Sequence, residues 1–185
     1  LSEDVTLPSN IRTNKDVTIN LNGHTINYRA YNGESESLIM ARIEEGGRLT
    51  INGPGAINSN GYIASANKGA KIFVNGGDFK AYTTAFQSNG GEVYLLGGTY
   101  EENSVPAEPK YLVNYIDSQV GKGTISISGG TFKNPKKDTT GGADYLRYCY
   151  EVWFAQMLGM EGWNNYFSCL YNNEGSYELA KDYPH

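Results

Sequence analysis

Ile72-Phe-Val-Asn-Gly-Gly-Asp-Phe79 is the first of three segments that share one form, followed by Val93-Tyr-Leu-Leu-Gly-Gly-Thr-Tyr100 and Ile125-Ser-Ile-Ser-Gly-Gly-Thr-Phe132. Two looser copies precede them, Val17-Thr-Ile-Asn-Leu-Asn-Gly-His-Thr-Ile26 and Leu49-Thr-Ile-Asn-Gly-Pro-Gly-Ala-Ile57. Apolar and polar residues alternate in each copy, which is typical of a half-buried strand. Glycine then allows the positive φ of a sharp corner. The pattern predicts a recurring unit of strand, corner and strand.

The spacing of the copies predicts a solenoid with inserted loops. Equivalent positions are Ile19, Ile51, Val74, Leu95 and Ile127, at intervals of 32, 23, 21 and 32 residues. The short intervals represent the basic coil. The long ones contain polar, turn-rich insertions at 27–37 and 101–110, as expected of loops inserted into a repeat.

A third apolar stretch lies between successive copies: Leu38–Ile43, Tyr62–Ser65, Thr84–Gln87 and Tyr111–Ile116. Each coil is therefore expected to contain three short strands. We predict an all-β, single-stranded right-handed parallel β-helix of four to five coils over residues 1–133, with Ile51, Val74 and Leu95 stacked directly over one another. A β-sandwich lacks this three-part recurrence, and an α/β fold needs helical periodicity that residues 1–133 do not show.

The first segment, from Leu1 to Ile26, resembles the opening coil of pectate-lyase-like right-handed β-helix proteins, in which the phrase V-T-L-x-L-N-G-x-T-I recurs; Val17 to Ile26 matches this phrase. The Gly-Gly-Thr-Phe copies are similar to later coils of bacterial surface proteins and bacteriophage virion proteins. The resemblance covers residues 1 to about 133. It implies the fold, whereas activities differ among relatives, which include adhesins, fibres, tailspikes and enzymes that cleave acidic polysaccharides.

Residues 134–185 do not repeat and are rich in aromatic side chains. Helix-like spacing of Leu146, Trp153 and Met157 favours a helix from Asp144 to Gly159, although the β-branched and aromatic content would also suit strands. Two interpretations stay open, a cap over the last coil and a recognition surface. The second makes these the expected ligand-binding residues: Tyr145, Tyr148, Trp153, Trp163, Tyr166 and Tyr171. The two cysteines, Cys149 and Cys169, form either one disulfide or two buried thiols.

No catalytic constellation stands out in the sequence. Enzymes of this architecture use clustered acidic residues with a Lys or Arg partner. The carboxylates considered are Asp78, Glu92, Glu101, Glu102 and Asp117, with Arg42, Lys71 and Lys80 as partners. Asp78 aligns with Thr99 and Thr131, which favours a small polar turn position. His24 is interpreted as a polar corner residue, and the pair Glu44-Glu45 as solvated. We expect no catalytic residues, no metal site and no cofactor.

The charge and hydropathy of the sequence argue against two classes of partner, nucleic acids and membranes. The net charge of −5 argues against a nucleic-acid partner, because phosphate binding needs clustered Lys and Arg. The one basic cluster, Lys133 with Lys136 and Lys137, is interpreted as a solvated turn. No apolar run is long enough to span a membrane, and we expect no signal peptide from the opening Leu1-Ser2-Glu3-Asp4, which lacks a basic start and an apolar stretch.

The sequence thus favours a non-enzymatic structural or surface-recognition module. We expect it on a bacterial surface or a phage particle, outside the cell, contacting a surface glycan or a protein receptor. A homo-oligomer, for example a trimer, is also expected. The alternative is a carbohydrate-active enzyme, a lyase or a hydrolase, that acts on acidic polysaccharide.

Overall fold

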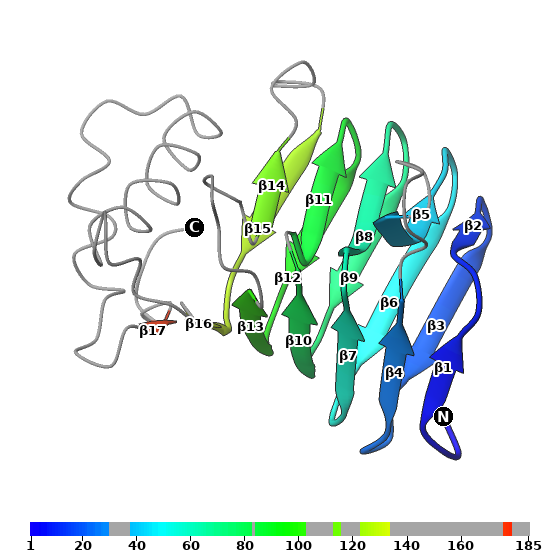
Figure 1. Cartoon of the computed structure of the whole chain (residues 1–185). Coiled ribbons are helices and arrows are strands. Elements are labelled where there is room, and N and C mark those ends of the chain that lie inside the picture. The colour runs from blue at the N-terminus through cyan, green and yellow to red at the C-terminus, as the bar shows by residue number, and fades with distance from the viewer. Residues whose placement is uncertain (30–37, 83, 103–112, 116–122, 134–175, 179–185) are drawn as a thin grey trace.

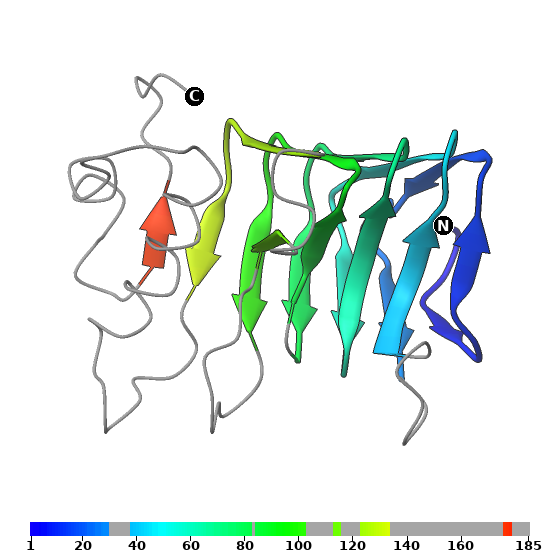
Figure 2. The same cartoon turned by 90° about the horizontal axis from the view of Figure 1, so that it is seen from above.

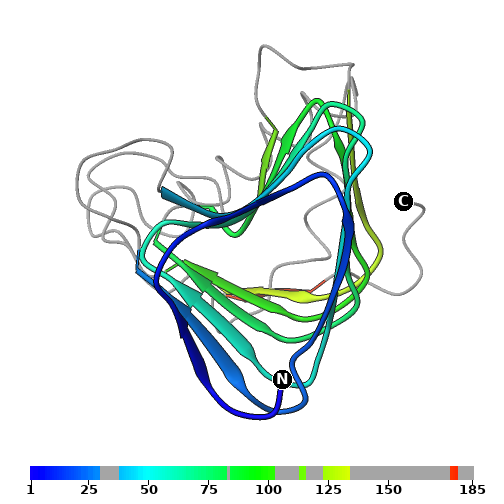
Figure 3. The same ribbon diagram turned by 90° about the vertical axis from the view of Figure 1, so that its right-hand side faces the viewer.

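A computed structural model of the chain describes residues 1–29, 38–82, 84–102, 113–115, 123–133 and 176–178. Their strands form three sheets, which we name A, B and C (Figure 1). The chain passes from sheet A to sheet B to sheet C and back to sheet A. We call one such passage a coil, and the described strands β1 to β15 belong to five successive coils. Seen end-on in Figure 3, the three sheets enclose a three-sided interior.

Each coil contributes one strand to each sheet. Sheet A contains β1 (Val5–Leu7), β4 (Thr25–Tyr28), β7 (Ala56–Ser59), β10 (Asp78–Ala81), β13 (Thr99–Glu102), β16 (Thr131–Lys133) and β17 (Ser176–Glu178). Sheet B contains β2 (Ile11–Thr13), β5 (Ile39–Ile43), β8 (Tyr62–Asn67), β11 (Phe86–Asn89) and β14 (Val113–Tyr115). Sheet C contains β3 (Asp16–Asn20), β6 (Arg48–Asn52), β9 (Lys71–Val74), β12 (Glu92–Leu95) and β15 (Thr124–Ile127).

Successive coils stack in parallel, as Figure 2 shows from above, and the paired residues are in register. In sheet C, Ile51 pairs with Ile19 and Val74, and Leu95 pairs with Val74 and Ile127. The predicted column is therefore confirmed, and the side chains of Ile51, Val74 and Leu95 are fully buried. The all-β class and the parallel stacking of strands are confirmed with it.

The column in sheet A contains the aromatic residues of the repeat. Ile26, Ile57, Phe79 and Tyr100 follow one another in register. Phe79 and Tyr100 are stacked with ring centroids 5.2 Å apart. Phe86 of sheet B meets both rings edge-on, so aromatic packing joins two sheets across the interior.

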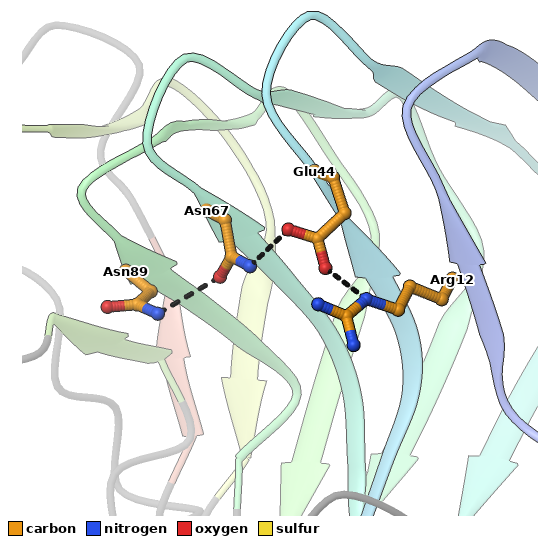
Figure 4. A network of polar contacts seen from close by, with 4 residues as sticks. All are labelled: Arg12, Glu44, Asn67 and Asn89. Carbon is orange, nitrogen blue, oxygen red and sulfur yellow. Dashed lines mark hydrogen bonds and ion pairs between the residues drawn. The ribbon is translucent and has the colours of Figure 1, made fainter.

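The outer surface carries polar ladders that also follow the register. Asn52 Nδ2 donates to Asn20 Oδ1 (2.7 Å), and Asn75 Nδ2 donates to Asn52 Oδ1 (2.6 Å). A second network links Arg12, Glu44, Asn67 and Asn89 over four coils of sheet B (Figure 4). Hydrogen bonds therefore connect coils at the surface, as apolar contacts do in the interior.

One strand of the C-terminal segment is described. β17 pairs antiparallel with β16, the last parallel strand of sheet A, and so covers an edge that would otherwise be unpaired. The expected helix from Asp144 to Gly159 and both cysteines lie outside the described residues.

Candidate functional site

The six aromatic residues expected to bind a ligand lie outside the described residues, as does Asp117. They are Tyr145, Tyr148, Trp153, Trp163, Tyr166 and Tyr171. Their proposed role stays a prediction.

A groove of about 450 Å³ lies at the outer surface of sheet A, where its strands end and the chain turns toward sheet B. This is within the size range of small-ligand sites. Buried Tyr28 and Ser59 contribute to its lining. The other lining residues are Thr6, Asn27, Arg29, Asn58, Asn60 and Tyr82.

The register of sheet A brings these residues together from distant parts of the sequence. Thr6 pairs with Asn27, and Asn27 pairs with Asn58. All three precede or follow inward-facing residues and so lie on the outer face. Asn58 Nδ2 donates to Asn27 Oδ1 at 3.1 Å, which fixes the orientation of both amides. The groove thus crosses neighbouring coils and follows the direction in which they stack.

The corner beside the groove is held by hydrogen bonds. The backbone N–H of Asn60 donates to the carbonyl of Tyr28 (3.3 Å), and that of Tyr82 donates to the carbonyl of Gly61 (3.2 Å). Ser59 Oγ accepts from the N–H of Gly61 (3.0 Å) and donates to the carbonyl of Tyr62 (3.1 Å). The groove is therefore preformed by the scaffold.

The residues that line the groove carry amide and hydroxyl groups and almost no charge. Among the described residues of the lining, Arg29 alone has a formal charge at neutral pH. Burial raises the pKa of Tyr28, so its phenol stays protonated. The side chain of Tyr82 is 46% exposed and presents an aromatic surface beside the amides. Such a lining can donate and accept hydrogen bonds and can stack against a ligand.

The ionisable residues considered for catalysis are divided between the sheets. Glu92 lies on sheet C, where it accepts from Lys71 Nζ (2.9 Å) and Tyr94 Oη (2.5 Å). Both hydrogen bonds lower the pKa of the Glu92 carboxyl, and the bond from Tyr94 has the larger effect. A carboxylate held ionised in this way is poorly suited to act as a general acid.

Asp78, Lys80 and Glu101 lie on sheet A, where Lys80 Nζ is 3.5 Å from Glu101 Oε2. Asp78 pairs in register with Thr99, which confirms the predicted alignment. Arg42 lies on sheet B, and Glu102 lies on β13. The described candidates are thus spread over three sheets.

His24 lies at the corner before β4, as the sequence predicts. Its neighbour there is Asp4, which the sequence did not indicate. The Nδ1 of His24 is 3.5 Å from Asp4 Oδ1, and the same oxygen accepts from the backbone N–H of Thr25 (2.8 Å). Asp4 therefore ties the first coil to the second at this corner.

Sheet C carries an aromatic surface that was not predicted from the sequence. Phe73 and Tyr94 stack in parallel with centroids 4.7 Å apart, and the Arg48 guanidinium lies 5.4 Å from the Phe73 centroid. The sequence contained a signal for this stacking, because Phe73 and Tyr94 occupy the same outward position of the repeat. The groove had a similar signal, since Asn27 and Asn58 each follow the inward residue of their copy.

Within the described residues there is no group of three His, Cys, Asp or Glu side chains able to hold a metal ion. The same part of the chain has no helix with the length and apolarity of a membrane span. No family model matches the chain, and no significant match is found among curated proteins or solved structures.

Proposed function

We propose that the chain is a structural or surface-recognition module: a right-handed parallel β-helix, capped at its C-terminal end, used for attachment or assembly on a bacterial surface or a phage particle. In this function the stacked coils serve as a stiff support. Specificity resides in the side chains that the support displays.

One observation carries the proposal: a groove lined by amide and hydroxyl side chains crosses coils that are stacked in register. Its amides are oriented by a neighbouring amide and its corner by backbone hydrogen bonds. A site held in this way loses little conformational entropy on binding, which favours recognition.

The arrangement of carboxylates supports binding more than turnover. Glycoside hydrolysis needs two carboxyl groups that flank the same bond. The described candidates include Glu92 on sheet C and Glu101 on sheet A, each beside a lysine. Neither lies among the residues that line the groove.

The test separates binding from turnover. The purified chain is applied to an array of linear neutral and acidic oligosaccharides, and it is incubated in parallel with polygalacturonate and alginate. We expect binding on the array without unsaturated products or new reducing ends. Turnover of either polymer would overturn the proposal in favour of an enzyme, and absence of binding across the array would refute glycan recognition.

A further inference from the structure

We infer that the outer face of sheet C is an interface at which two copies of the chain pack face to face. The two copies are related by a two-fold axis parallel to the strands, and the rings of Phe73 and Tyr94 lie at the centre of the interface. The inference goes beyond the proposed function, because it concerns another sheet than the groove and another kind of partner. It holds or fails whatever the groove recognises.

The outer face of sheet C is aromatic in its third and fourth coils and polar in the others. Thr18 and Thr50 occupy one outward position in the first two coils, and Ser126 occupies it in the fifth. Phe73 and Tyr94 occupy the same position in the third and fourth coils, where they stack and stay partly exposed. The register alone does not require aromatic residues at this position. The two rings therefore form a local patch of the kind that is enriched at protein interfaces.

Leu96 enlarges the aromatic patch. Asn20, Asn52 and Asn75 form an amide ladder at the neighbouring outward position, and Leu96 takes that position in the next coil. The side chain of Leu96 is 46% exposed. A leucine here interrupts the ladder and leaves apolar surface in water, a cost that contact with another chain would remove.

The charged residues beside the rings indicate which partner fits. Lys71 and Glu92 each precede a ring by two residues, and Lys71 Nζ lies 2.9 Å from Glu92 Oε2 in an ion pair that stays partly exposed. Consider a second copy rotated about an axis that is parallel to the strands and passes between β9 and β12. This rotation places the partner's Glu92 over Lys71 and the partner's Lys71 over Glu92, with each ring over the other ring of the partner. The face is thus complementary to itself in charge, which favours a second copy over a partner of uniform charge.

The other two-fold axis in the plane of the interface runs along the stack and lacks this complementarity. It would place Lys71 over the partner's Asn75 and Glu92 over the partner's Leu96. An ionised carboxylate covered by an apolar side chain loses water without gaining an opposite charge. The charges therefore favour the axis parallel to the strands.

The size of the face sets the expected strength of the dimer. Sheet C has five strands, most of them four or five residues long. With strands about 4.8 Å apart and a rise of about 3.3 Å per residue, the face covers about 400 Å² on each copy. Stable complexes bury about 800 Å² per partner, so we expect a weak dimer that forms as the concentration rises.

Charge-reversal variants are the principal test. Sedimentation equilibrium follows the molar mass from about 10 μM to about 1 mM, the range in which weak interfaces form. We expect a rise toward twice the 20.3 kDa mass of the chain. Lys71→Glu and Glu92→Lys should each raise the dissociation constant of the dimer at least about tenfold, because like charges then face each other. An equimolar mixture of these two variants should restore the dimer, because each variant meets the opposite charge on the other.

Lys80→Glu is the matched control, because it breaks an exposed ion pair with Glu101 on sheet A. This variant should form the dimer as the unmodified chain does, and circular dichroism establishes that every variant is folded. A single-chain mass over the whole range, or a trimer, would overturn the inference. So would a dimer that Lys71→Glu and Lys80→Glu weaken equally, or a mixture of charge-reversal variants that stays monomeric. None of these results bears on the groove, whose recognition function is tested on the array.

Discussion

In the three repeated segments that end in Gly-Gly, a polar residue and an aromatic residue, the second glycine has a backbone conformation that residues with side chains rarely adopt. Gly77, Gly98 and Gly130 have φ values of 126°, 108° and 115°. A Cβ at Gly98 would lie 2.8 Å from the carbonyl oxygen of Gly77 in the coil below. Glycine is therefore needed here for both the turn and the close stacking of coils.

Gly98→Ala should lower the free energy of unfolding by about 1–3 kcal/mol, because it combines a strained φ with a backbone clash. Urea denaturation measures the loss. Gly76→Ala is the control, since Gly76 is the first glycine of its pair and a Cβ there would meet no atom closer than 3.8 Å. Equal losses in the two variants would contradict this role of the second glycine.

Tyr100 differs from the other aromatics of its column in carrying a buried hydroxyl. Its side chain is fully buried, and its Oη donates to the carbonyl of Gly97 at 2.5 Å. Burial raises the pKa of Tyr100, so the phenol remains neutral and keeps this bond at physiological pH. The bond ties the aromatic column to the Gly-Gly corner of the same coil.

Tyr100→Phe should cost about 1 kcal/mol of unfolding free energy, because the carbonyl of Gly97 loses its partner while the ring packing is kept. Thermal unfolding of this variant is compared with that of Tyr82→Phe, which changes an exposed tyrosine. A loss no greater than that of Tyr82→Phe would show that the hydrogen bond adds nothing to stability.

At the scale of the strand, Glu44 links neighbouring coils of sheet B. It accepts from Asn67 Nδ2 (2.7 Å) in the next coil and from Arg12 Nε (2.6 Å) in the preceding one. The bond from Asn67, followed by that from Arg12, lowers the pKa of Glu44. Its ionised form is thus favoured by folding.

This lowered pKa makes the contribution of Glu44 dependent on pH. The stabilisation is present above the ordinary pKa of glutamate and is lost as the pH falls through the lower folded value. Glu44→Gln should therefore destabilise the chain by about 1 kcal/mol near neutral pH and by less in acid. Urea midpoints across pH measure this difference, with Glu45→Gln as control. A difference that grows in acid would contradict the account.

Much of the strand architecture could be predicted from the sequence, because alternation and glycine corners are local signals. Columns such as Ile26, Ile57 and Phe79 follow directly once the copies are aligned. The groove was not predicted, because Tyr82 lies outside the repeated phrase and comes to line the same groove as Asn27 and Asn58 only through the stacking of coils. The pairing of Asp4 with Thr25 was missed because no repeated copy was recognised before Val17.

At the scale of the whole molecule, the first coil has strands that are paired on one side only. At the first coil, β1, β2 and β3 are edge strands of their sheets. Apolar residues there, among them Val5, Val17 and Ile19, are only partly buried. Exposed edges of this kind favour pairing with other chains.

Oligomerisation stays a prediction of the sequence, and light scattering tests it. A trimer should give three times the molar mass of the 20.3 kDa chain. A single chain mass at all accessible concentrations would contradict it and would leave the recognition module as a monomer.

The stacking of coils in register underlies the columns, the ladders and the groove. The most direct test is a nuclear Overhauser experiment on protein with labelled Ile, Leu and Val methyl groups. Cross-peaks are expected between Ile51 and Val74 and between Val74 and Leu95, which pair in adjacent strands. The absence of both would contradict the stacked arrangement, and with it the groove that depends on it.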